Sequence, residues 1–137
     1  RQQPYPPIWV GGHTKPVMRR AARVGDVWLP PLFGTTPASL AESFAGVRDM
    51  AEQAGRPREA VNLALRVLVD LRDEPDITGP DTRGAVLGPA AKVAEVLASY
   101  MEIGVSHFVL LPQARTLQDV QRTVDIIAND VIPQVRG

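Results

Sequence analysis

The stretch from residue 61 to residue 71 constrains the fold most, because its apolar residues alternate strictly over eleven positions. One side of the stretch is aliphatic throughout and consists of Val61, Leu63, Leu65, Val67, Val69 and Leu71. The other side consists of Asn62, Ala64, Arg66, Leu68 and Asp70. Successive side chains of a strand point to opposite faces, so this period of two predicts a β-strand with one buried face.

Three shorter apolar runs, at residues 8–10, 27–29 and 105–111, predict the other strands. Amphipathic stretches between them are typical of helices, which begin at Thr or Pro and in three cases end at a glycine, namely Gly25, Gly55 and Gly104. The connection 73–87 is rich in Pro, Gly and Asp and lacks a period, which predicts an excursion or a partly disordered segment.

The last helix is predicted to begin at the cap Thr116 and to end at Pro133. Its spacing predicts a buried stripe made of Val120, Val124, Ile127 and Val131.

Four apolar strands that alternate with four helices predict an α/β fold with parallel strands covered by helices. Such a (βα)4 array is half of an eight-stranded TIM-type barrel. A flavodoxin-like open sheet is the rival architecture. With 137 residues we expect a single domain over residues 1–137, and the Pro-rich opening without Met resembles the middle of a longer protein.

Composition narrows the classes of function. The formal net charge is zero, with 15 basic and 15 acidic residues. The basic residues form no cluster in the sequence, so nucleic-acid binding is not expected. The chain has no Cys and two distant His residues, so we expect neither a disulfide nor a metal site. No apolar run approaches a membrane span or a signal peptide, so a cytoplasmic protein without membrane association is expected.

Gly11 and Gly12 follow the first strand directly, at the point where the next helix begins. Glycines let the backbone approach a ligand closely, and the free N–H groups of a helix N-terminus attract anions. Thr14 is chemically a better cap for this helix than Lys15. The pattern therefore predicts an anion-binding loop, with a plain strand-to-helix turn as the alternative.

Several motifs in order carry a resemblance to a known family. They are Pro-Pro-Ile-Trp-Val-Gly-Gly at 6–12, Arg-Arg-Ala-Ala-Arg-Val-Gly-Asp-Val-Trp-Leu-Pro at 19–30, Ala-Glu-Gln-Ala-Gly-Arg at 51–56, Gly-Val-Ser-His-Phe-Val-Leu at 104–110 and Val-Ile-Pro at 131–133. Together they resemble the luciferase-like monooxygenases, which are flavin- or deazaflavin-dependent oxidoreductases. The resemblance implies the C-terminal half, (βα)5–8, of a TIM-type barrel.

The resemblance also implies site residues. In this family the Gly-Gly after barrel strand five lies near the phosphate-bearing tail of the coenzyme, which implies FMN or coenzyme F420 at Val10, Gly11, Gly12 and Thr14. The chain departs from the family pattern at His13-Thr14, where relatives often have Asn-Ser. It departs again at Val27, where relatives usually have Gly. The second departure puts the cofactor contacts around strand six in doubt.

Two other polar residues are candidates for the site. If the face of Arg66 lines a barrel, its guanidinium suits the carboxylate of a substrate or the coenzyme tail. An internal pair with Asp70 and a plainly exposed Arg are the alternatives. His107 is a candidate proton donor, with a hydrogen-bonded wall histidine as the alternative. For His13 the choice lies between a ligand donor and an exposed loop residue.

The resemblance implies a flavin- or F420-dependent oxidoreductase or monooxygenase that acts on a small organic substrate. We expect this chain alone to be inactive, because half of a pocket would be missing. A non-catalytic half-barrel is the alternative, and its exposed strand edges predict a homodimer. A phosphate-binding barrel of another chemistry is a further alternative.

Overall fold

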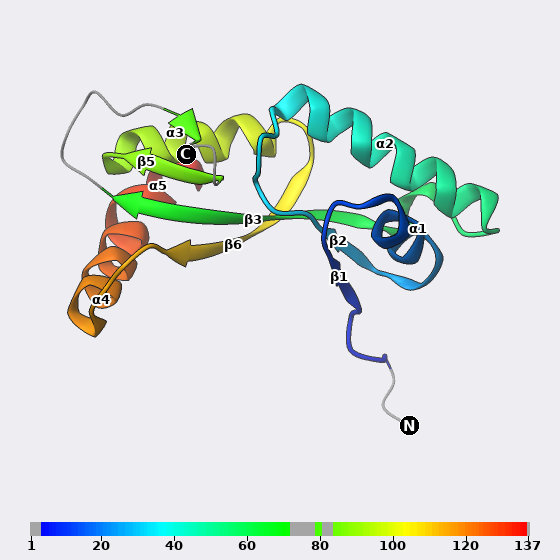
Figure 1. Cartoon of the computed structure of the whole chain (residues 1–137), viewed down its shortest axis with the longest axis horizontal. Coiled ribbons are helices and arrows are strands. Elements are labelled where there is room, and N and C mark those ends of the chain that lie inside the picture. The colour runs from blue at the N-terminus through cyan, green and yellow to red at the C-terminus, as the bar shows by residue number, and fades with distance from the viewer. Residues whose placement is uncertain (1–3, 72–78, 81–83, 137) are drawn as a thin grey trace.

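The computed structural model describes residues 4–71, 79–80 and 84–136, and in chain order these form an alternating α/β array (Figure 1). The elements are β1 (Trp9–Gly11), α1 (Lys15–Val24), β2 (Val27–Leu29), α2 (Pro37–Gln53), the 3-10 turn η1 (Arg58–Ala60), β3 (Asn62–Leu71), β4 (Gly79–Pro80), β5 (Ala85–Gly88), α3 (Ala90–Met101), β6 (Val105–Pro112), α4 (Leu117–Ile126), the π-helical η2 (Ile127–Val131) and α5 (Ile132–Arg136).

The four main strands are parallel and lie side by side in chain order, β1–β2–β3–β6. Trp9 pairs with Val27, Val27 pairs with Asn62, and further along β3 Arg66 pairs with Val109. An open doubly wound sheet reverses its strand order at a switch point, whereas a βα barrel keeps chain order. The topology therefore favours the barrel over its flavodoxin-like rival, and the predicted α/β fold with parallel strands is confirmed.

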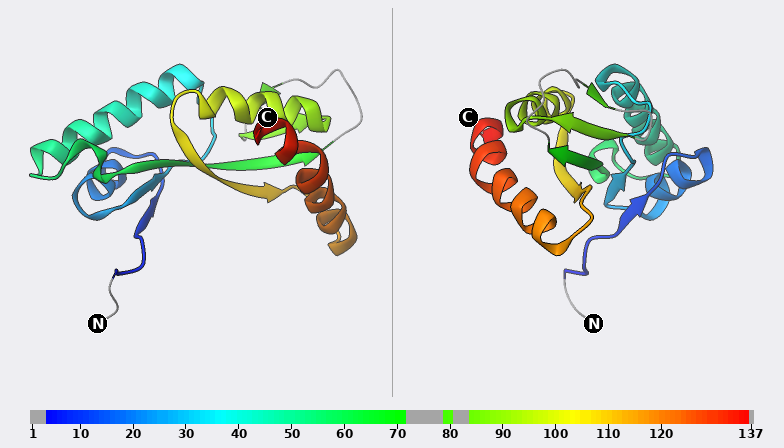
Figure 2. Two further views of the ribbon diagram at one scale, coloured as in Figure 1. Left: turned by 180° about the vertical axis from the view of Figure 1, so that it is seen from behind. Right: turned by 60° about the vertical axis from the view of Figure 1, so that its left-hand side comes forward.

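One face of the sheet carries the hydrophobic core. The aliphatic side of β3 is fully buried, from Leu63 through Leu65 and Val67 to Val69. The helices lie around the outside of this face in an arc (Figure 2, right). The buried residues of α2 that pack into this core are Leu40, Phe44, Val47 and Ala51. The period of two in residues 61–71 therefore predicted the buried face of the sheet correctly.

The opposite face of the sheet has no helix over it in the described part of the chain (Figure 2, right). We call it the open face, and Asn62, Arg66 and His107 are exposed on it. Trp9 is 40% exposed there, and its ring meets the ring of His107 edge-on at 5.5 Å. In a βα barrel this face lines the interior.

The excursion predicted over residues 73–87 contains regular structure. Residues 72–78 and 81–83 lie outside the described residues, but β4 and β5 pair antiparallel, and β5 pairs parallel with the end of β3. Because β6 occupies one edge of β3, β5 shares the other edge with β2 and continues beyond it. β2 is only three residues long and does not reach the end of β3. β5 therefore supplies the hydrogen-bond partners for the backbone of β3 from Leu68 to Leu71 on that edge.

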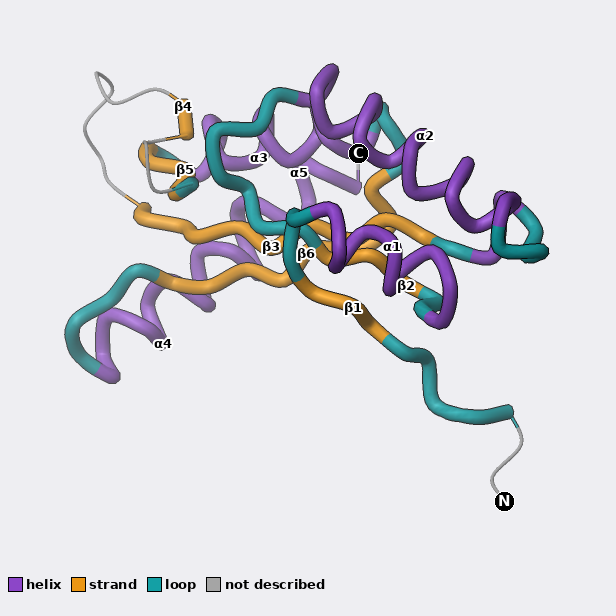
Figure 3. Tube along the Cα trace, turned by 45° about the vertical axis from the view of Figure 1, so that its right-hand side comes forward, coloured by secondary structure: helices purple, strands orange, loops and turns teal. Residues whose placement is uncertain are grey.

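The end of the chain corrects a second prediction. Ile127 and Val131 are buried as predicted, but Val124 is 50% exposed and Val120 is only half-buried. α4 lies beyond the carboxyl end of β6, away from the middle of the sheet (Figure 3). The helix does not end at Pro133 either, because a π-helical turn precedes α5 and places this proline in the first turn, where its missing N–H costs little.

Glycine ends two helices by different means. Gly55 has φ of 77° after α2, as a left-handed C′ glycine should. Gly25 ends α1 with φ of −84°, so the conformation does not require glycine there. Close packing does, because a Cβ would lie 2.9 Å from the Ala21 carbonyl oxygen and 3.0 Å from a Val10 methyl group.

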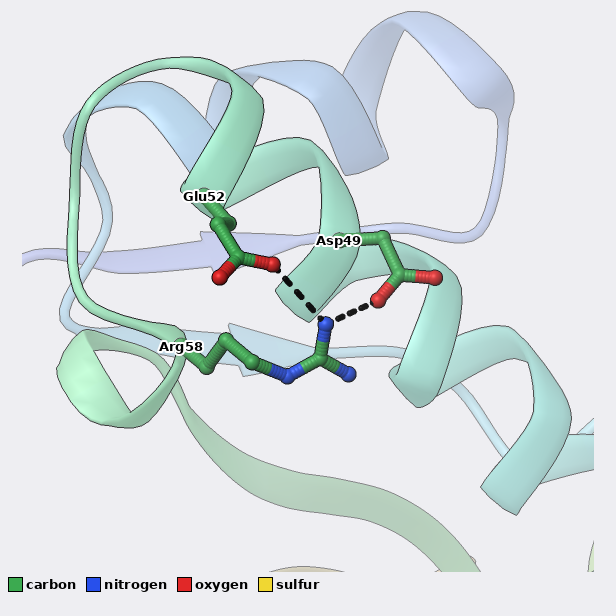
Figure 4. A network of polar contacts seen from close by, with 3 residues as sticks. All are labelled: Asp49, Glu52 and Arg58. Atoms are coloured by element: carbon green, nitrogen blue, oxygen red, sulfur yellow. Dashed lines mark hydrogen bonds and ion pairs between the residues drawn. The ribbon is translucent and has the colours of Figure 1, made fainter.

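Two arginines fix the turn between α2 and β3. Arg56 donates hydrogen bonds to the carbonyl oxygens of Ala22 at 2.7 Å and Gly25 at 2.8 Å, and so caps the end of α1. Arg58 pairs with Asp49 and, at 3.3 Å, with Glu52 (Figure 4). The second network is exposed and contributes little stability. The hydrogen bonds of Arg56 explain why an arginine follows Gly55, the glycine that ends α2.

Candidate functional site

The turn after β1 is held in place from two sides. The N–H of Gly12 donates to the Leu29 carbonyl oxygen at 3.0 Å, and the Trp28 indole donates to the Gly12 carbonyl oxygen at 2.8 Å. Gly12 has φ of 123°, and a Cβ there would lie 3.2 Å from a Val17 methyl group. Only glycine fits this conformation without strain, so the backbone requires glycine at position 12, whereas a Cβ at Gly11 would meet the Leu29 carbonyl oxygen at an ordinary 3.8 Å.

The helix that follows this turn lacks a side-chain cap. Thr14 is the N-cap of α1, as predicted, but its side chain makes no capping hydrogen bond. The equivalent Thr36 and Thr116, at α2 and α4, each form a complete capping box. The first turn of α1 also has no acidic residue. Its N–H groups are therefore available to an anion, and the positive end of the helix dipole favours one.

A hollow of about 260 Å³ opens on the open face beside this turn. Its lining comes from three elements and consists of His13, Pro31, Leu32, Phe33, Arg66 and Leu68. His13 is an exposed loop residue that also lines the hollow. The structure thus brings together the loop after β1, the loop after β2 and the middle of β3.

The loop after β2 is held by contacts from distant elements. The phenol of Tyr100 in α3 donates to the Thr35 carbonyl oxygen at 2.5 Å, and burial raises the pKa of that phenol. Gly84, before β5, packs so closely that a Cβ would lie 1.4 Å from the Leu32 carbonyl oxygen. These contacts fix the wall of the hollow that Leu32 and Phe33 form.

A second hollow, of about 430 Å³, lies at the ends of β3 and β6 and includes Asp70, Gln113 and Arg115. It shares no lining residue with the first hollow. The segment that follows β6 therefore contributes to a different hollow from the one beside the Gly-Gly turn.

Among the predicted site residues Arg66 lines the hollow, Gly11, Gly12 and Thr14 belong to the adjoining turn, and Val10 and His107 lie elsewhere. Val10 is 8% exposed with its side chain in the core, which leaves only its main chain for a ligand. His107 pairs with Ala64, two residues before Arg66 along β3, and its Nδ1 lies 3.0 Å from the Ser106 hydroxyl. His107 therefore lies nearer the amino ends of the strands, whereas barrel sites form at the carboxyl ends.

Trp28 is the residue whose role the sequence did not reveal. It lies in the short apolar strand β2, and its side chain is only 1% exposed. Its indole stacks on Phe44 at 6.4 Å, while its N–H supports Gly12 across sixteen positions of the chain. Because a buried indole N–H usually has a hydrogen-bond acceptor, the sequence could have predicted that Trp28 makes such a bond. It could not have predicted that the acceptor is Gly12.

Known structures share this fold. An F420-dependent secondary alcohol dehydrogenase superposes with a TM-score of 0.75 at 16% identity, covering 100% of this chain and 51% of that one. The coenzyme F420-dependent tetrahydromethanopterin reductase from Methanopyrus kandleri gives 0.71 at 10% identity, covering 94% and 51%. A long-chain alkane monooxygenase gives 0.71 at 16% identity, covering 96% and 41%. The chain thus spans about half of these TIM-barrel enzymes or less.

In the described part of the chain no helix is long and apolar enough to cross a bilayer. The family model of luciferase-like monooxygenases matches residues 1–77, which is more than half of the sequence and includes the Gly-Gly turn and the Trp28 motif. The chain belongs to the luciferase-like monooxygenase family.

Proposed function

We propose that this chain forms the C-terminal half, (βα)5–8, of a flavin- or F420-dependent oxidoreductase, and that its Gly-Gly turn binds the phosphate side of the coenzyme. The observation that carries the proposal is the turn Gly11–Gly12 leading into α1, whose N-cap Thr14 leaves the first-turn N–H groups without a side-chain acceptor. A phosphate of FMN or F420 supplies such an acceptor.

The residues present fit this role. A Cβ at Gly12 would lie 3.2 Å from a Val17 methyl group, so the glycine lets the turn pack directly on the start of α1. Thr14 and the α1 N–H groups would hold the phosphate, and Lys15 is exposed beside them. When bound, the coenzyme ring supplies the redox chemistry, and the protein binds, orients and shields it. Hydride transfer and oxygenation are both within this chemistry.

Coenzyme titration tests the proposal. We expect the fluorescence of FMN or F420 to be quenched or shifted when it binds to the longest natural polypeptide that contains this chain. We expect the same coenzyme to bind this chain alone more weakly. Gly12→Ala should weaken binding by about tenfold or more, because it strains the backbone at a φ that favours glycine. Gly46→Ala is the matched control, since a Cβ there meets no atom within 4 Å.

Two results would count against the coenzyme site. One is the absence of binding of both FMN and F420 to either polypeptide. The other is equal affinity of the Gly12→Ala and Gly46→Ala variants. A comparison of the affinities for FMN and F420 would also assign the cofactor. The cytoplasmic location stays a prediction from the sequence.

We also propose that the chain on its own self-associates through the open face. Several large apolar side chains are exposed on or next to it: Ile8 is 46% exposed, Trp9 40% and Leu111 37%. In the described residues β1 pairs on one edge only, and a free parallel edge invites pairing. A second copy would cover the surface that the rest of a barrel otherwise covers.

A further inference from the structure

We infer that Arg66 anchors a carboxylate of the organic substrate, with the apolar walls of the 260 Å³ hollow holding the rest of that substrate. The inference rests on the proposed function and names the substrate class of the same site. It follows from the position of Arg66, the absence of a partner for its guanidinium among the described residues, and the chemistry of the hollow.

The backbone of Arg66 is fixed on both edges of β3. Its N–H donates to the Pro30 carbonyl oxygen at 3.0 Å, and its carbonyl oxygen accepts from the Leu32 N–H at 2.8 Å. On the other edge it pairs with Val109. The side chain therefore leaves the open face from a rigid point, which is the condition for a precise binding group.

The guanidinium has no partner in the described part of the chain. No side-chain hydrogen bond or ion pair joins it to any described residue, so the internal pair with Asp70 does not form. Among the described strand residues of the open face, Arg66 is the one Lys or Arg. When a barrel or a second copy covers this face, an unpaired arginine becomes costly, and an anion offsets that cost.

The surroundings select an organic anion. Leu32, Phe33 and Leu68 line the hollow around the single guanidinium, and the side chain of Phe33 is 57% exposed to solvent. A planar guanidinium binds a carboxylate through two parallel hydrogen bonds. About 260 Å³ holds a small molecule, such as a short acid or one with a single ring. The phosphate of the coenzyme has its own site at the uncapped end of α1.

Titration with matched small molecules tests this inference. Benzoate and benzamide have the same shape, and only benzoate carries the charge. In amide-detected NMR titrations of this chain, benzoate should bind about tenfold more tightly than benzamide and shift the signals of residues around the hollow. Arg66→Met should remove this preference and Arg66→Lys should restore part of it. Arg23→Met, an exposed arginine on α1, is the matched control.

The affinities for FMN and F420, measured on the same variants, separate this inference from the proposed function. Unchanged coenzyme affinity in Arg66→Met, together with a lost benzoate preference, supports it. Equal binding of the two probes, no benzoate binding, or a preference that survives in Arg66→Met overturns it. Loss of coenzyme affinity in Arg66→Met also overturns it and assigns Arg66 to the coenzyme tail. A benzoate preference without any coenzyme binding supports the anion site and refutes the redox proposal.

Discussion

At the residue scale, the contact between Trp28 and Gly12 links the core to the candidate site. The indole is buried and stacked on Phe44, so its N–H donates from a fixed position to the Gly12 carbonyl oxygen at 2.8 Å. The main chain of the Gly-Gly turn thus depends on a residue sixteen positions away. The family motif that contains Trp28 therefore has a structural reason.

Trp28→Phe tests that link. It keeps an aromatic ring in the core but removes the donor, so the free energy of unfolding should fall by about 1–3 kcal/mol. Urea denaturation measures the change. Trp9→Phe is the control, since Trp9 is 40% exposed, and it should change stability by less than about 1 kcal/mol. An equal loss in both variants would contradict the supporting role of Trp28.

Tyr100 predicts a loss of stability at alkaline pH. Burial raises the pKa of its phenol above the ordinary value of 10.0, so the unfolded chain releases this proton at lower pH than the folded protein. Its contribution is therefore complete below about pH 10 and is lost as pH rises through the folded pKa. A hydrogen bond to Asp26 raises the pKa of Tyr5 in the same direction.

Urea denaturation between about pH 8 and pH 11 measures this effect. The Tyr100→Phe variant should show a shallower alkaline decline than the wild-type protein, and the variant that also carries Tyr5→Phe should be shallower again. An unchanged decline in the double variant would assign the alkaline loss to other groups.

At the scale of elements, the two threonine caps at α1 and α2 have the same sequence signature and different structures. Thr14 and Thr36 both precede a helix with proline in its first turn, but only Thr36 accepts from the N–H of a residue three positions on, Ser39, at 3.2 Å. The difference depends on that third residue, which in α1 is Val17 and has no polar group to return the bond.

Thr36→Ala and Thr14→Ala should therefore differ. Loss of a capping box costs about 0.5–2 kcal/mol, so Thr36→Ala should lower the free energy of unfolding by that amount. Thr14→Ala removes no capping bond and should change it by less than about 0.5 kcal/mol. Denaturation of the two variants checks this, and a larger cost at position 14 would show a cap that the helix uses in solution.

The sequence predicted the elements whose signal is local. The alternation in β3, the caps of α2 and α4 and the glycine after α2 each depend on neighbouring residues, and each was predicted correctly. β5 was missed, because its pairing with β3 depends on an edge that short β2 leaves open. The stripe of α4 was wrong at Val124 because periodicity does not indicate whether a partner lies opposite.

The candidate site was predictable only in part for the same reason. Gly12 and Thr14 are two positions apart in the sequence, so a local pattern could predict the strand-to-helix turn and its N-cap. The hollow joins His13, Phe33 and Arg66 from three separate segments, and only the strand register brings them together. The separation of His107 from this hollow also follows from register, which the sequence does not reveal.

At the scale of the whole molecule, the open face predicts association. The chain has a mass of 14.9 kDa, and light scattering after size exclusion should give about twice this value. Trp9→Glu places a charge on the open face and should shift the protein toward the monomer. Leu117→Glu is the control, because Leu117 is 82% exposed but lies on α4. A folded wild-type monomer, or equal effects of both variants, would contradict association through this face.

The pairing of β3 has a consequence for local opening. β3 is hydrogen-bonded along both edges, by β2 and β5 on one side and β6 on the other, whereas β1 pairs with β2 alone among the described strands. Amide hydrogen exchange should therefore be slowest in β3 and markedly faster in β1. Added FMN or F420 should slow exchange at residues 9–14 without changing β3. Under the proposed function, a small fluctuation of the edge strand β1 then releases the Gly-Gly turn and lets the coenzyme enter and leave while the centre of the sheet stays folded.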